Sequence, residues 1–284
     1  MAADMFDWTR HVYQTRLVDP DTKWTRRRLQ ILLAVVVGVA FALVAGGVWS
    51  MVGLLTGSRS AEDAGSGSQQ SAQDRLADRQ LPVAPLEAAQ PGSLSSGQTG
   101  TLQIPPPVEV GDVGVATGFP RTPEGALAQL AAIDSTALSS ASVRVAQDVI
   151  AAWAVPGGPT TESWSGVQAV AALLESAGMA SEAQNAITIS VEPKMGFIKG
   201  TVGDDFVVPC IDFIITATTL SSGTAGQPAQ VAAADCQRMV WQHGATGGRW
   251  VIGPGEEPAP APSLWPGSQA SFDAGYQWLE VPQT

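Results

Sequence analysis

The sequence predicts an α+β protein with one transmembrane helix, a disordered linker, and then helices packed on one face of an antiparallel sheet. Three observations lead to this prediction. An uncharged, almost entirely apolar run extends from Leu29 to Gly57, and no aromatic residue occurs between Trp49 and Phe119. Beyond Phe119 the spacing of apolar residues is first helical and later alternates, which is typical of helices followed by an antiparallel meander.

Composition excludes several classes of function. Charged residues make up 14% of the 284 residues, against roughly 25% in an average globular protein. The net charge of −11 argues against a nucleic-acid-binding face, because phosphate binding needs a basic surface. With two histidines and two cysteines, the chain by itself cannot build a classical zinc finger or a multi-histidine metal site.

The uncharged run predicts a transmembrane helix over residues 29–56, because about 20 apolar residues suffice to cross the hydrocarbon core. A buried core helix is the alternative, but such helices are rarely so long and so uniformly apolar. Trp24 and Trp49 would lie about 37 Å apart along a helix at 1.5 Å per residue. We therefore expect one tryptophan at each membrane interface.

Basic residues flanking the run predict its orientation. Arg26, Arg27 and Arg28 precede it, whereas Arg59 is the only basic residue close behind it. Positive residues stay in the cytoplasm, so residues 1–28 form a cytoplasmic tail and the rest of the chain lies outside the cell membrane. A cleaved signal peptide would have a shorter apolar core, so an uncleaved single-pass anchor is favoured.

Residues 57–117 predict a disordered linker. They are rich in Gly, Ser, Gln, Ala and Pro, and such a segment buries too little apolar surface to offset the entropy of ordering. The run Pro105-Pro106-Pro107 is expected to be extended and stiff near its end.

The extracytoplasmic domain is predicted over residues 118–284, and it begins with helices. Thr122 is the expected cap of a helix that starts at Pro123, since proline is favoured at the first helical position. The Ser-rich stretch 135–142 is expected to break this helix. Helical spacing then predicts two more helices, over about 145–153 and about 161–178.

Alternation and β-branched residues predict a meander of strands in the second half of the domain. The expected strands cover residues 187–191, 197–202, 206–219, 230–242 and 249–252. The aromatic C-terminal tail, which contains Trp265, Phe272, Tyr276 and Trp278, is expected to pack back on the domain as a short helix ending near Gly275.

The two cysteines lie symmetrically about the middle of the hairpin loop predicted at 221–228. Antiparallel pairing would place Cys210 directly opposite Cys236, within disulfide range and turned away from the predicted core face. An oxidising compartment favours a disulfide over the alternative of two buried thiols. Asp212 and Arg238 would be diagonal neighbours beside the cysteines, which predicts a structural ion pair.

A search for catalytic chemistry finds no motif. His243 is the only histidine in the predicted extracytoplasmic part of the chain. The sequence contains no nucleophile elbow there, and it contains no P-loop or dinucleotide fingerprint. The pairs Asp204-Asp205 and Glu256-Glu257 are interpreted as solvated. We therefore predict no catalytic, cofactor-binding or metal-ligating residue and no cofactor.

The segment Val115-Ala116-Thr117-Gly118-Phe119-Pro120-Arg121-Thr122-Pro123-Glu124-Gly125-Ala126-Leu127 opens the domain. This string, with the order of tail, span, linker and domain, resembles bitopic scaffold subunits of type IV secretion and conjugation machines, including TcpC-type proteins. It is more similar to uncharacterised membrane-anchored proteins of mobile elements in high-GC Gram-positive bacteria. The resemblance implies a cystatin-like fold, also called nuclear-transport-factor-two-like, with a curved sheet. TcpC-type proteins usually have two outer domains, whereas this chain has room for one.

The expected function is that of a non-enzymatic, single-pass membrane scaffold in a conjugation or type IV secretion apparatus. Its expected partners are other subunits of that apparatus, the membrane and further copies of itself, with no nucleic acid bound by the outer domain. The alternatives are an accessory protein of a lipid-import (Mce-type) system, a cell-wall-associated binding domain and a wall-acting hydrolase.

Overall fold

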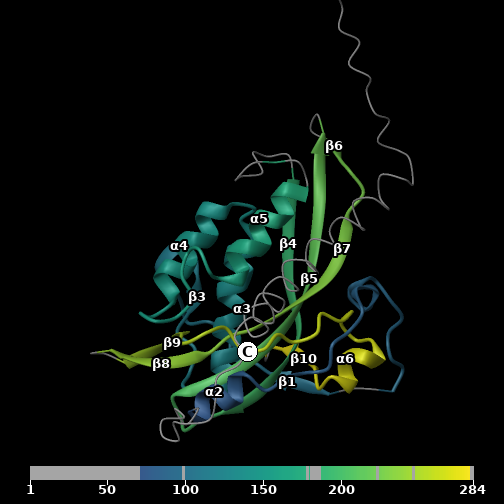
Figure 1. Ribbon diagram of the computed structural model, residues 1–284. Coiled ribbons are helices and arrows are strands. Elements are labelled where there is room, and N and C mark those ends of the chain that lie inside the picture. Colours follow the sequence, from purple (N-terminus) through teal and green to yellow (C-terminus); the bar gives the residue numbers. More distant parts are fainter. Residues whose placement is uncertain are drawn as a thin grey trace, which may run out of the picture.

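The computed structural model describes residues 71–97, 100–176, 179, 187–221, 224–244 and 247–281. These residues form helices and a mostly antiparallel sheet, which confirms the predicted α+β class (Figure 1). Within these ranges no helix has the length and apolarity needed to span a membrane. The predicted span 29–56 and the interface residues Trp24, Arg26, Arg27, Arg28 and Trp49 lie outside the described ranges.

Three helices follow one another as the sequence predicts. They are α3 (Pro123–Ser139), α4 (Val143–Trp153) and α5 (Ser165–Ser176). The hydroxyl oxygen of Thr122 accepts a hydrogen bond from the backbone N–H of Gly125 at 3.1 Å, so Thr122 caps α3 as expected. Ser142 caps α4 in the same way, after the predicted break in the Ser-rich stretch.

The main sheet has the strand order β1-β10-β4-β5-β8-β9, and β6 and β7 also pair with β5. The strand bounds are β1 Thr101–Gln103, β4 Ile187–Thr201, β5 Phe206–Ser221, β6 Thr224–Ala225, β7 Ala229–Cys236, β8 Met239–Gly244, β9 Gly247–Ile252 and β10 Gln277–Glu280. All of these pairs are antiparallel except β1 with β10.

Two strand predictions were wrong in detail. The strands expected at 187–191 and 197–202 are one long strand, β4, which continues through two register shifts. The strand expected at 230–242 is two strands, because the chain leaves the ladder at Gln237 and Arg238. As a result β7 and β8 lie end to end along the same edge of β5.

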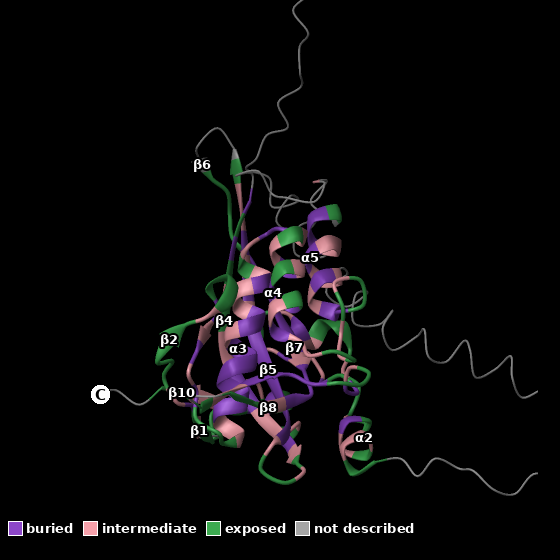
Figure 2. Cartoon of the chain, turned by 90° about the vertical axis from the view of Figure 1, so that its left-hand side faces the viewer, coloured by how far each residue is buried: buried purple, intermediate pink, exposed green. Residues whose placement is uncertain are grey.

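The main core lies between the helices and one face of the sheet (Figure 2). Leu127 and Leu130 of α3 are buried there together with Ile211, Phe213 and Ile215 of β5. The β5 residues are two apart in sequence, so they point to one face of the sheet.

The opposite face of the sheet is covered by both ends of the described chain. Met195, Cys210 and Ala234 are buried on that face under Leu264 and Tyr276 of the C-terminal part. The segment after Ser71 contributes α2 (Ala72–Ala77), the 3₁₀ helix η1 (Leu86–Ala89) and partly buried apolar side chains that pack on the same cluster. As predicted, the C-terminal part includes a short helix, α6 (Gln269–Asp273), before Gly275.

The prediction of a disordered linker is wrong for the described residues between 71 and 117. β1 pairs with β10, and β2 (Glu109–Val110) pairs with β3 (Ala116–Thr117). Composition indicates only how much apolar surface a segment can bury by itself. Here Ala77 and Ala89 are buried against the folded domain, which supplies the apolar surface that the segment lacks.

Candidate functional site

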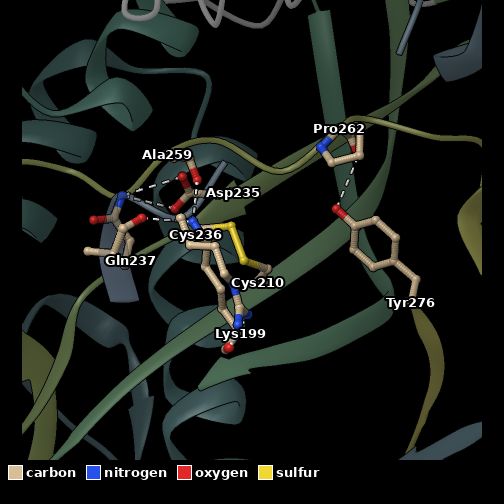
Figure 3. Close-up of a disulfide and its surroundings, with 10 residues drawn as sticks. Lys199, Cys210, Asp235, Cys236, Gln237, Ala259, Pro262 and Tyr276 are labelled. Carbon is tan, nitrogen blue, oxygen red and sulfur yellow. Dashed lines mark hydrogen bonds between the residues drawn. A yellow bond between two sulfur atoms is a disulfide. The ribbon is translucent and has the colours of Figure 1, made fainter. Parts of the chain in front are cut away.

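The predicted disulfide is present at the centre of the sheet. Cys210 on β5 and Cys236 on β7 are directly opposite each other with their Cα atoms 4.1 Å apart, and they are bonded to each other (Figure 3). Both are buried on the face that the chain ends cover, away from the main core, as the sequence predicts.

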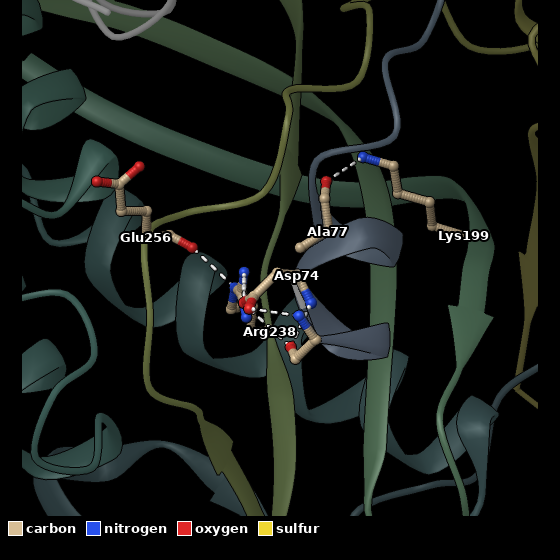
Figure 4. Close-up of polar contacts among 6 residues, drawn as sticks. Asp74, Ala77, Lys199, Arg238 and Glu256 are labelled. Carbon is tan, nitrogen blue, oxygen red and sulfur yellow. Dashed lines mark hydrogen bonds and ion pairs between the residues drawn. The ribbon is translucent and has the colours of Figure 1, made fainter. Parts of the chain in front are cut away.

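The ion pair predicted between Asp212 and Arg238 is not formed. Arg238 lies at the break between β7 and β8, and its guanidinium donates to Asp74 Oδ1 at 2.8 Å and to the carbonyl of Glu256 at 2.9 Å (Figure 4). Asp212 is fully buried, and neither carboxylate oxygen has a hydrogen-bond partner in the described part of the chain. Burial raises the pKa of Asp212 well above its ordinary value.

Lys199 on β4 fastens both ends of the described chain to the sheet. Its buried ammonium donates to the carbonyl oxygens of Ala77 at 2.8 Å and Ala259 at 3.1 Å, and Arg79 donates to the carbonyl of Lys199 itself. Burial, followed by the charge of Arg79, lowers the pKa of Lys199 to about 8. A charge held by two carbonyls is a structural clamp between segments far apart in sequence.

Three carboxyl groups come together between the helices and β7. Asp134 lies on α3, Asp235 on β7 and Glu257 in the segment after β9. The amide nitrogen of Gln237 donates to Asp235 Oδ2 at 3.0 Å and to Glu257 Oε1 at 3.3 Å. The same Glu257 oxygen accepts from the backbone N–H and the hydroxyl of Ser165, at 3.0 and 3.1 Å, and so holds the first residue of α5.

This carboxyl cluster (Asp134, Asp235 and Glu257) retains protons more strongly than free carboxyls. Burial, then the charge of Glu257, raises the pKa of Asp235 to about 7. Burial also raises the pKa of Glu257, and burial together with the charges of Asp235 and Glu257 raises that of Asp134 well above its usual range. Among the described residues, no group of three or more His, Cys, Asp or Glu side chains is arranged to hold a metal ion.

Sequence reasoning missed this cluster. The interpretation of Glu256-Glu257 as solvated holds for Glu256, which is exposed, but not for Glu257, which caps α5. One available signal was Asp134, a carboxylate whose neighbours three and four positions away on α3, Leu130, Ala131 and Ala137, are all apolar. No sequence rule pairs Asp134 with Asp235, because the helix and the strand that carry them meet only in the folded chain.

The remaining polar candidates are on the surface. The side chain of His243 is 67% exposed, and its Nε2 lies 3.6 Å from Asp205. Asp205 also forms an ion pair with Arg121 at 2.6 Å, which ties the turn before β5 to the residue preceding the α3 cap.

A groove of about 410 Å³ opens beside β1, at one edge of the sheet. Its lining comes from β1, the proline run and the start of α3, and consists of Leu102, Gln103, Ile104, Pro105, Pro120, Thr122 and Glu124. The chain continues from the groove through Val108, which is 80% exposed, into the exposed strand β2, where Val110 is 74% exposed (Figure 2). This arrangement offers a surface for binding rather than a set of reacting groups.

Comparison with protein-family models, with curated proteins and with solved structures finds no match to this chain.

Proposed function

We propose that this chain is a non-enzymatic, single-pass membrane scaffold of a conjugation or type IV secretion apparatus, with a cystatin-like domain outside the cell membrane. The observation that carries the proposal is the buried disulfide between Cys210 and Cys236. Structural disulfides belong to oxidising compartments, and this one lies in the part of the chain that the arginines before the apolar run assign to the outside.

The contacts that the charged residues make support a role in assembly. Lys199 and Arg238 bind backbone carbonyls of distant segments, and Glu257 caps a helix. These groups therefore hold the domain together. The groove beside β1 and the exposed valines that follow it offer a surface on which another protein can dock.

Affinity purification of the full-length protein in mild detergent, with mass spectrometry of the co-purifying proteins, tests the proposal. The matched control is an unrelated single-pass protein of the same orientation, expressed at the same level. Secretion ATPase and channel subunits found only with this chain are the expected result. Lipid-transport components would support the lipid-import alternative instead, and a protein that purifies alone would contradict a scaffold.

The oxidation state of the cysteines in cells tests the assigned compartment. We expect a bridged Cys210–Cys236 peptide when cells are lysed in the presence of a thiol-alkylating reagent, before any disulfide can form in the lysate. Recovery of both cysteines in alkylated form would contradict an extracytoplasmic domain.

A further inference from the structure

We infer that the open edge of β1, together with the adjacent groove, binds an extended and basic segment of a partner protein by strand addition. The inference rests on the proposed function, since it names the kind of segment that a subunit of the apparatus would present. Strand addition combines backbone hydrogen bonds for affinity with a pocket for alternate side chains.

The backbone of β1 defines the open edge. The carbonyl of Gly100 accepts from Trp278, and the N–H of Ile104 donates to the carbonyl of Glu280. Successive residues of a strand direct their backbone groups to opposite sides, so Thr101 and Gln103 turn their N–H and C=O groups away from β10. β1 is the terminal strand of the sheet, and both residues are exposed.

The groove lies where the side chains of an added strand would contact the domain. It is lined on one side by residues of β1 and the proline run, and on the other by Pro120, Thr122 and Glu124 at the start of α3. Leu102, Ile104 and the prolines supply apolar walls, while the carboxylate of Glu124 supplies a negative charge. An added segment with alternating apolar and basic residues fits this combination.

Charge selects a basic partner over a second copy of the chain. Glu124 lines the groove, and Glu280 is opposite Gln103 on the neighbouring strand β10, where its carboxylate accepts from the Gln103 amide at 2.7 Å. Arg121, the basic residue next to the groove, already pairs with Asp205. Two copies meeting at this edge would place these carboxylates against one another, and the part of the chain after the predicted span carries 9 basic and 22 acidic residues.

The test uses the full-length protein in detergent and three synthetic peptides. The first alternates valine and lysine over eight residues, and the second replaces each lysine with glutamate. The third keeps the valine–lysine sequence but carries an N-methyl group on every backbone nitrogen, which removes the hydrogen-bond donors of both strand edges without changing charge. We expect the first peptide to bind at least about tenfold more tightly than either of the others, since both charge and paired backbone groups contribute.

Two variants locate the binding to β1. Gln103→Pro removes a backbone donor that faces the open edge and no bond of the β1–β10 ladder, so the fold tolerates it. We expect it to weaken binding of the valine–lysine peptide about tenfold, whereas Gln103→Ala, which keeps the donor, has little effect. Glu124→Gln should weaken binding about two- to fivefold, and Glu175→Gln on the distant end of α5 serves as its charge-matched control.

The outcomes separate this inference from the proposed function. Equal binding of the plain and N-methylated peptides, or full binding by a folded Gln103→Pro variant, would overturn strand addition. If channel subunits still co-purify with that variant as with the unchanged chain, the scaffold role stands and the β1 edge is not its docking surface. Binding of the basic peptide by a protein that purifies from cells alone would contradict the scaffold role while leaving the site intact.

Discussion

The ammonium of Lys199 lies 2.8 Å from the carbonyl oxygen of Ala77, a residue 122 positions earlier in the chain. This contact joins the central strand β4 to the helix α2, and a second bond from the same ammonium reaches Ala259. The segment that begins at Ser71 is thereby part of the domain, and so is the segment after β9.

Lys199→Met is expected to loosen both ends of the described chain. The substitution keeps an apolar stem of similar length but removes the ammonium donor from the carbonyl of Ala259 and one of two donors from the carbonyl of Ala77, which also accepts from the N–H of Ala259 at 3.0 Å. We expect a loss of about 1–3 kcal/mol of unfolding free energy. Amide hydrogen exchange around α2 should become faster than in the unchanged protein. Lys194→Met is the control. The ammonium of Lys194 is partly exposed and pairs with Glu192 at the surface, so its removal should lower the free energy of unfolding by no more than about 1 kcal/mol. Equal effects of the two variants would argue against the clamp.

Removal of the disulfide is expected to destabilise the domain. The bond closes a loop with a sequence separation of 26, for which chain entropy gives about 3–4 kcal/mol. The double variant Cys210→Ala/Cys236→Ala should therefore unfold at a lower denaturant concentration than the oxidised protein. Because both cysteines are buried, a soluble reductant should open the bond only under conditions that unfold the chain. Rapid reduction of the native protein would contradict the buried placement.

Stability is expected to fall as pH rises from about 4 to about 7. The pKa of Asp235 is about 7 in the fold against an ordinary value of 3.8, so the folded state binds more protons than the unfolded state in this window. The folded state is therefore favoured at low pH, and this contribution is lost as pH passes 7. The loss is on the order of 4 kcal/mol for this group.

Asp235→Asn is expected to flatten this part of the pH profile, measured by denaturant titration between pH 4 and pH 8. Asp204→Asn, the same substitution in the exposed turn before β5, is the control. A slope that is the same in the unchanged protein and in Asp235→Asn would contradict a raised pKa of Asp235 in the fold.

Replacement of Asp212 by valine is expected to stabilise the fold. The carboxyl is fully buried without a hydrogen-bond partner among the described residues, and burial of an unpaired polar group is costly. Valine suits a strand, so we expect a gain of about 1–3 kcal/mol in unfolding free energy at neutral pH. A loss of similar size would mean that Asp212 has an interaction partner in the working protein.

Gly125→Ala is expected to disrupt the start of α3. A Cβ atom at this position would approach the carbonyl oxygen of Pro120 far inside contact distance, and that oxygen also accepts from Trp250 Nε1 at 2.9 Å. The backbone must shift, which costs about 2–3 kcal/mol. Gly92→Ala is the control, because its nearest neighbour would be at an ordinary 3.6 Å. Thermal unfolding of the two variants checks the difference, and equal midpoints would contradict it.

The sequence by itself determined those features that depend on nearby residues. The helix starting at Pro123 follows from its own cap and apolar spacing, and the pairing of Cys210 with Cys236 follows from the symmetry of one hairpin. In such elements the interacting residues are close in sequence, so their spacing alone specifies which residues come into contact.

Only the tertiary structure decided whether the described residues between 71 and 117 are folded, which groups Arg238 binds, and that the carboxyl cluster forms. Each depends on surfaces supplied by remote parts of the chain: α2 packs on strands more than a hundred residues later, and Asp134 meets Asp235 across a helix–sheet contact. Whether a small or charged residue is buried is determined by what covers it, and that information lies in no local pattern.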